Sequence, residues 1–132
     1  MSAAYLGTWR LVPELSHYDA GGPPEGGSYR IEDRDGVLHF TIDWVKDAQA
    51  MSASYIGHAD GTPVTAPHPG VDEASVLHED DRTLSGSATA GGAVIARTMR
   101  RVSTDGRLMS VLQETANGQG GWHKTFQLYF RQ

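Results

Sequence analysis

Six histidines and a cluster of arginines are the side chains in this 132-residue sequence whose types most readily do chemistry. Neutral imidazole is both a common metal ligand and a proton shuttle near neutral pH. The histidines stand at positions 17, 39, 58, 68, 78 and 123, and no two of them show the i, i+4 helical or i, i+2 strand separation that places two rings on one face. We therefore expect no metal site and no cofactor.

His123 is the histidine with the best case for a functional role. It lies on a strand predicted over residues 122–130, where His123, Gln127 and Tyr129 share one face. A histidine there could donate a hydrogen bond to a ligand or act as a general acid–base. The alternative is an exposed residue just beyond a glycine-rich turn.

Four arginines, at positions 97, 100, 101 and 107, flank the turn Asp105-Gly106. Strand alternation puts Arg97 and Arg101 on one face and Arg100 on the other, so at least one could point inward and bind an anion. Cross-strand pairing with exposed carboxylates is the more common arrangement, and we expect it here.

The elements that must position these side chains are strands. The sequence has 16 glycines and 6 prolines at intervals of about ten residues, which is typical of turns between short strands. Residues 17–27 read as a loop, residues 62–70 as a loop or edge strand because they hold three prolines, and residues 12–17 and 46–51 as the only candidates for short helices. The predicted strands cover residues 5–12, 28–32, 37–45, 51–58, 74–78, 83–88, 94–102, 108–115 and 122–130.

Tight turns between consecutive strands make most neighbours antiparallel, and closure into a barrel removes the exposed sheet edges. We therefore predict an all-β, single-domain protein over residues 1–132, an up-and-down barrel of about 8–10 strands. In residues 37–45, the alternating set Leu38, Phe40, Ile42 and Trp44 should face the interior.

The sequence does not decide which face of the last predicted strand points inward, because its polar face lies opposite an apolar face formed by Phe126, Leu128 and Phe130. A barrel wide enough to hold a ligand often has a partly polar inner wall. If the apolar face is exposed instead, a homodimer becomes a possibility.

Short motifs at the two ends of the chain carry a family resemblance. Gly7-Thr8-Trp9 resembles the G-x-W signature of the calycins, the lipocalin and fatty-acid-binding-protein barrels, and the chain is similar to a group of small bacterial lipocalin-like proteins. The resemblance implies that Arg131, near the end of the last strand, stacks on Trp9 in a structural role.

Fatty-acid-binding proteins hold the ligand carboxylate with an Arg-x-Tyr pair on the last strand. Here the matching residues are Gln127-Leu128-Tyr129, so the tyrosine is kept and the arginine is not. The resemblance therefore implies a neutral or weakly polar ligand rather than a fatty acid. The haem-binding barrel nitrobindin opens with a longer Gly-x-Trp-x-Gly-x-Gly motif, which is absent here.

Charge and composition exclude several classes of partner. The 11 basic and 16 acidic residues give a net charge of −5, which argues against nucleic acid. There is no cysteine, no signal-like N-terminus and no apolar stretch of membrane-spanning length, so we expect a cytoplasmic protein without a membrane partner.

The resulting prediction is a barrel that binds one small, largely apolar molecule. The alternatives are a small barrel enzyme, such as an isomerase, cyclase or hydratase that uses His123 or Tyr129 as an acid–base residue, and an interaction module with a filled core. The predicted ligand-binding residues are Tyr29, Phe40, Trp44, Tyr55, Met99, Met109, His123, Gln127 and Tyr129.

Overall fold

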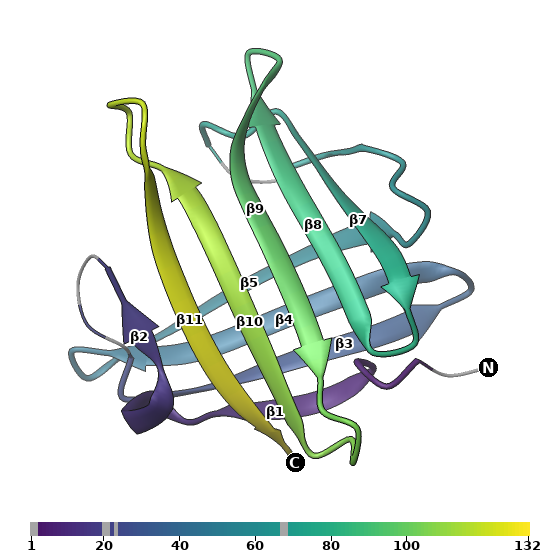
Figure 1. The fold of residues 1–132 in the computed structure, drawn as a ribbon, viewed down its shortest axis with the longest axis vertical. Helices are drawn as coiled ribbons and strands as arrows, with labels where there is room; N and C mark the ends of the chain where they lie inside the picture. The colour runs from purple at the N-terminus through teal and green to yellow at the C-terminus, as the bar shows by residue number, and fades with distance from the viewer. Residues whose placement is uncertain (1–2, 20–21, 23, 67–68) are drawn as a thin grey trace.

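Antiparallel strands form an almost closed barrel in the computed structural model, which describes residues 3–19, 22, 24–66 and 69–132 (Figure 1). A short 3₁₀ helix, η1, follows the first strand. The elements in chain order are β1 (Gly7–Leu11), η1 (Pro13–Leu15), β2 (His17–Tyr18), β3 (Gly26–Arg34), β4 (Val37–Lys46), β5 (Gln49–His58), β6 (Val64–Thr65), β7 (Glu73–Asp80), β8 (Thr83–Ala90), β9 (Ala93–Val102), β10 (Leu108–Ala116) and β11 (Trp122–Arg131).

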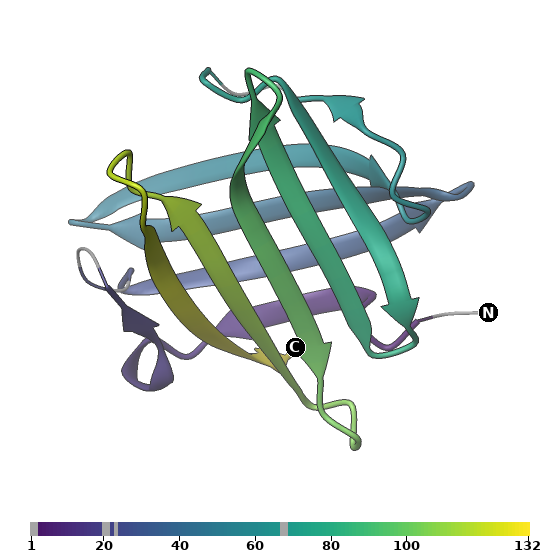
Figure 2. The same cartoon turned by 45° about the horizontal axis from the view of Figure 1, so that its top comes forward.

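The strands follow the order β5-β4-β3-β1-β11-β10-β9-β8-β7-β6, so the first and last long strands pair with each other. Figure 2 shows β8 to β11 crossing in front of β3 to β5, and the space between the two layers becomes the interior of the barrel. The short strand β2 pairs with β11 beside this interior. The expected antiparallel up-and-down barrel is confirmed.

The barrel closes between β5 and β7 through few contacts. In the described chain, a single bridge joins Asp60 to Leu77, with backbone hydrogen bonds from Gly61 to Val76 at 2.9 Å and from His78 to Ala59 at 2.7 Å. Gly57 allows this approach, because a Cβ atom there would lie 2.6 Å from Cγ2 of Val76.

The nine predicted strands all form, with shifted ends, and β2 and β6 add two short strands in segments predicted as loop and as loop or edge. The helix predicted over residues 46–51 is wrong. Asp47 and Ala48 have φ values of 52° and 63° and form the turn of a hairpin in which Lys46 pairs with Gln49. A two-residue hairpin needs positive φ at both central residues, because that twist matches the twist of the strands.

The alternating face predicted for β4 is confirmed, since Leu38 and Phe40 are buried in the core. On β11 the polar face turns inward: Tyr129 is buried, whereas Phe126 and Phe130 are 39% and 41% exposed on the outside. An apolar strip therefore crosses the outer faces of β10 and β11, where Leu112 pairs with Phe126 and Leu108 with Phe130. The possible homodimer stays a prediction.

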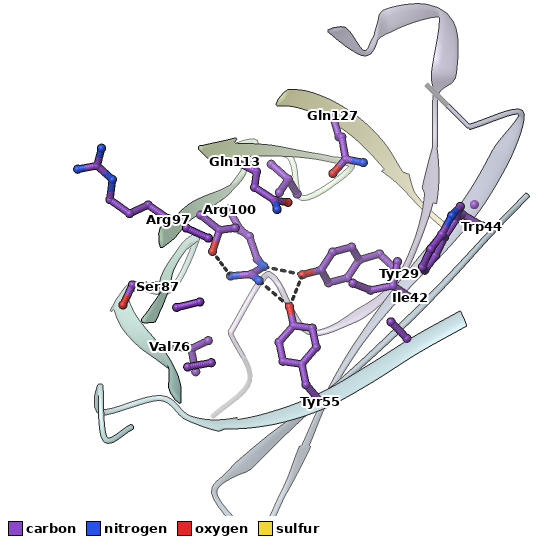
Figure 3. A pocket seen from close by; sticks show the side chains of 18 of the residues that line it. Tyr29, Ile42, Trp44, Tyr55, Val76, Ser87, Arg97, Arg100, Gln113 and Gln127 are labelled. Carbon is purple, nitrogen blue, oxygen red and sulfur yellow. Dashed lines mark hydrogen bonds between the residues drawn. The ribbon is translucent and has the colours of Figure 1, made fainter. Parts of the chain in front are cut away.

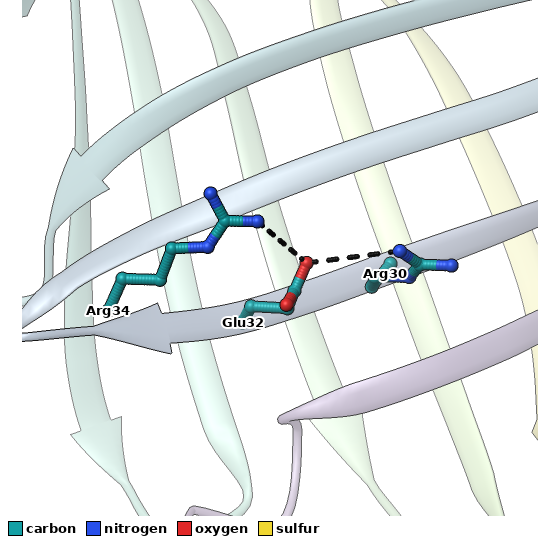
Figure 4. Close-up of polar contacts among 3 residues, drawn as sticks. All are labelled: Arg30, Glu32 and Arg34. Carbon is teal, nitrogen blue, oxygen red and sulfur yellow. Dashed lines mark hydrogen bonds and ion pairs between the residues drawn. The ribbon is translucent and has the colours of Figure 1, made fainter.

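The outer face of β3 has the ordinary polar character of a solvated sheet. Glu32 lies between two arginines of its own strand, with its carboxylate 4.0 Å from Arg30 and 3.3 Å from Arg34 (Figure 4). All three side chains are exposed or partly exposed, so these pairs contribute little to stability.

Candidate functional site: a cavity with a buried guanidinium

A cavity of about 530 Å³ lies inside the barrel. Its size falls within the range of small-molecule sites in proteins. Strands β3 to β5 contribute mainly apolar side chains, among them Ile42, Trp44 and Ala53, and β9 to β11 contribute most of the polar ones. Figure 3 shows side chains from both layers directed into the same space.

Asp43, Arg97 and Arg100 are the charged residues that line the cavity, and Arg100 is the buried one, with a relative exposure of only 2%. Its Nε donates a hydrogen bond to the Tyr29 hydroxyl at 2.8 Å, and Nη2 donates to the Tyr55 hydroxyl at 2.9 Å (Figure 3). Nη1 lies 3.3 Å from Oγ1 of Thr98. The guanidinium also lies over the Phe40 ring, with 5.1 Å between Cζ and the ring centroid.

Strand alternation places Arg100 inside the barrel. On β9, Val102 and Arg100 are buried while Arg101 between them is exposed, so even-numbered residues face inward. Gly86 on the neighbouring β8 leaves room for the long side chain, since a Cβ there would lie 2.6 Å from Thr98 Oγ1 and 3.4 Å from Arg100 Nη1.

Arg100 and its two tyrosine partners, Tyr29 and Tyr55, form a cluster that still has unused hydrogen-bond donors. A guanidinium has five N–H groups, of which three are used here. The hydroxyls of Tyr29 and Tyr55 both accept from Arg100 and lie 3.1 Å apart, so one donates to the other and a single hydroxyl proton is left over. The cluster can therefore donate further hydrogen bonds to one acceptor-rich group.

The charge of Arg100 has no carboxylate partner in the part of the chain that the structure describes. Tyr29 does not supply a negative charge, because burial raises its pKa well above the usual value of a tyrosine despite the opposing effect of Arg100. Burial likewise raises the pKa of Tyr129, so both phenols are neutral at physiological pH. Burying an unpaired cation costs free energy of folding, and an anion bound beside it would offset that cost.

Uncharged polar groups line another part of the same cavity. Nε2 of Gln127 on β11 donates to the Tyr18 hydroxyl on β2 at 2.5 Å. Burial raises the pKa of Tyr18, with the Gln127 hydrogen bond acting in the opposite direction. Gln113 on β10 also lines the cavity, and no hydrogen bond to its side chain occurs within the described residues.

Five of the sequence-predicted residues line the cavity: Tyr29, Trp44, Tyr55, Gln127 and Tyr129. Phe40 and Met109 lie in the packed core and not on the cavity wall, with relative exposures of 1% and 0%. Phe40 still supports the site, because its ring stacks on Tyr55 with 4.6 Å between centroids.

Two predicted residues lie elsewhere. His123 lies on the same side of β11 as Gln127 and Tyr129, but it is the second residue of the strand and its side chain is exposed. Met99 lies on the outer face of β9, opposite the exposed Leu112 of β10. His123 was selected for the strand face that it shares with Gln127 and Tyr129. Neither His123 nor Met99 is among the residues that line the cavity.

Arg100 is the buried charged residue of the cavity that the predicted ligand-binding set left out. The signal was present, because strand parity separates Arg100 from Arg97 and Arg101. The expected exposed pairing does hold for Arg97, which lies 3.8 Å from Glu114 and stacks over Trp122 at 4.3 Å. Arg97 is also one of the residues that line the cavity, but Figure 3 shows its guanidinium directed away from Arg100, Tyr29 and Tyr55.

The stacking of Arg131 on Trp9 is confirmed, with 4.2 Å between Cζ and the ring centroid. Arg131 also donates to the carbonyls of Gly106, Leu6 and Ala4, which ties the chain ends together. Gly7 has φ of +129°, and a Cβ there would lie 2.7 Å from Arg131 Nη1. This contact explains why glycine precedes the buried tryptophan.

Two other kinds of feature are absent from the described residues. No three His, Asp or Glu side chains converge as a metal site would require, and His68 lies outside the described residues. No helix in this part of the chain is long and apolar enough to span a membrane.

The fold closely matches solved structures of low sequence identity. A secretary abundant heat soluble (SAHS) protein from Ramazzottius varieornatus superposes with a TM-score of 0.73 at 11% identity, covering 100% of this chain and 98% of the other. A fatty acid binding protein from Schistosoma mansoni in complex with arachidonic acid gives 0.63 at 10% identity, with coverages of 98% and 96%. Zebrafish ileal bile acid-binding protein complexed with cholic acid gives 0.61 at 10%, with 98% and 100%.

These likenesses concern the fold, because the identities are low. No family model matches the sequence, and no curated protein sequence matches it.

Proposed function

From the premise that the chain has the calycin β-barrel fold, we propose that it binds a small amphipathic molecule inside the cavity. The apolar body of the ligand packs against Ile42, Trp44 and Ala53. Its anionic head, a carboxylate or a group of similar geometry, accepts hydrogen bonds from Arg100 and from a tyrosine hydroxyl.

The observation that carries this proposal is the buried Arg100 without a carboxylate partner among the described residues. A guanidinium stays protonated at physiological pH and prefers the planar geometry of a carboxylate. Gln127 in place of an arginine suggested a neutral ligand, but Arg100 offers the missing charge from another strand. Two similar barrels were solved with arachidonic acid and cholic acid, both carboxylic acids.

A matched pair of ligands tests the proposal. Hexadecanoate and hexadecanol share one chain and differ in the head group, and their affinities can be measured by isothermal titration calorimetry. We expect the wild-type protein to prefer hexadecanoate by roughly ten- to a hundredfold, the effect of a charge-assisted hydrogen bond of about 1.5–3 kcal/mol. Arg100→Met should remove the preference and leave hexadecanol binding unchanged.

Arg101→Met is the control, because it removes the same charge one residue away, on the exposed outer face. It should keep the preference. Equal affinities for acid and alcohol in the wild-type protein would contradict the proposal.

The two alternative functions have less support. An acid–base pair of His123 and Tyr129 is disfavoured, because one is exposed and the other buried, and six strand residues span about 20 Å. A filled-core interaction module does not account for a cavity of about 530 Å³.

A further inference from the structure

The inner face of β10 and β11 carries two carboxamides that the anionic head does not need. Gln113 pairs with Thr125 across these strands and Val111 pairs with Gln127, so the two glutamines are diagonal neighbours on one face. Figure 3 shows both side chains directed into the cavity, beside Arg100 and Tyr29. Both residues line the cavity.

These amides have unused hydrogen-bond capacity. Gln127 uses Nε2 to reach Tyr18, and its Oε1 accepts no hydrogen bond from a described residue. The side chain of Gln113 makes no hydrogen bond at all within the described residues. None of these side-chain atoms is both fully buried and unpaired, so they remain accessible from the cavity.

The chemistry of the pair differs from that of Arg100. A carboxamide is uncharged and offers both a donor and an acceptor, whereas the guanidinium only donates. It therefore suits a hydroxyl or carbonyl group better than a second anion. The facing wall of β3 to β5 combines apolar residues such as Ile42, Trp44 and Ala53 with the two tyrosines that bind Arg100, and it contributes no carboxamide to the described lining. A hydroxyl or carbonyl group on the ligand body therefore finds its carboxamide partners on the side of β10 and β11.

We infer that Gln113 and Gln127 form a second, uncharged subsite, which selects ligands with a hydroxyl or carbonyl group on the apolar body in addition to the acidic head. This inference rests on the proposed function, since Arg100 fixes one end of the ligand. Gln127 is oriented by Tyr18, and Gln113 is free to turn toward the ligand.

Octadecanoate and its 9-, 10- and 12-hydroxy derivatives provide the test, with affinities from competition against one fluorescent fatty acid. We expect at least one hydroxy acid to bind roughly three- to tenfold more tightly than octadecanoate, as one neutral hydrogen bond allows. Gln113→Met, which keeps the length of the side chain, should abolish the difference between the affinities of that hydroxy acid and octadecanoate. Arg100→Met should weaken both acids by the same factor.

The outcomes separate the two proposals. If octadecanoate binds in an Arg100-dependent way but no hydroxy acid binds better, or if the gain survives in Gln113→Met and Gln127→Met, the subsite is refuted and the proposed function stands. If no acid binds, both are refuted. Gln113→Met has no hydrogen bond to lose, so it tests the subsite even if Gln127→Met fails to fold.

Discussion

Arg100 is a buried cation, and its guanidinium contacts only neutral groups among the described residues. These are the hydroxyls of Tyr29, Tyr55 and Thr98 and the ring face of Phe40. Hydrogen bonds to neutral groups offset part of the desolvation cost, but none of them neutralises the charge. Residues kept for binding often reduce stability in this way. The free protein should therefore be less stable than a version with an uncharged side chain at this position.

We predict that Arg100→Met raises the free energy of unfolding of the ligand-free protein by about 1 kcal/mol or more. Tyr29 and Tyr55 lose a donor, but their hydroxyls lie 3.1 Å apart and can still pair with each other. Urea denaturation measures the change, with the exposed Arg101→Met expected to stay within about 0.5 kcal/mol of wild type. A loss of stability in Arg100→Met would mean that the tyrosine contacts outweigh the desolvation cost.

At the scale of elements, the weakest part of the barrel is the junction of β5 and β7. The other long strands are joined by continuous ladders, whereas this junction has one bridge and a close contact of Gly57 with Val76. The contact is possible only because position 57 lacks a side chain.

We predict that Gly57→Ala lowers the free energy of unfolding by about 1–3 kcal/mol, because the new methyl group overlaps Val76. Val76→Ala should recover part of this loss when the two changes are combined, and a double-mutant cycle in urea measures the coupling. Gly26→Ala is the control, since nothing lies within 4 Å of a Cβ at that strand position. Additive effects at positions 57 and 76 would contradict the proposed packing.

At the scale of the whole molecule, four tyrosines make the stability of the fold depend on alkaline pH. Burial is the largest cause that raises the pKa of Tyr5, Tyr18, Tyr29 and Tyr129. In the unfolded chain a tyrosine ionises near pH 10. Because the folded pKa values are raised, the stability they contribute is full below about pH 10 and is lost as the pH rises through the folded values.

We therefore predict cooperative unfolding above about pH 10, with tyrosinate absorbance at 295 nm appearing together with the loss of strand circular dichroism. Tyr29→Phe should move this transition to higher pH, because it removes one proton that the folded state holds tightly. If all five tyrosines ionised near pH 10 with the strand signal intact, burial would not be controlling them.

Local pattern determined much of this molecule. Turn residues and alternation located the nine strands and the inward face of β4, because these depend on neighbours in sequence. The resemblance of Gly7-Thr8-Trp9 to the calycin signature implied the Trp9–Arg131 stack. Reasoning from local pattern failed for residues 46–51, where alanine and lysine suggested a helix and the hairpin twist required a turn.

The cavity and the proposed binding site within it were decided only by the tertiary structure. Arg100 meets Tyr29 and Tyr55 across 71 and 45 residues of sequence, and no local pattern records which strands will face each other across a cavity. The orientation of β11 was likewise open, since alternation fixes two faces and not which one is inside. In the hollow barrel, Gln127 and Tyr129 point into the interior. This is possible because a cavity that solvent or a ligand can enter tolerates polar groups, whereas a filled core would exclude them.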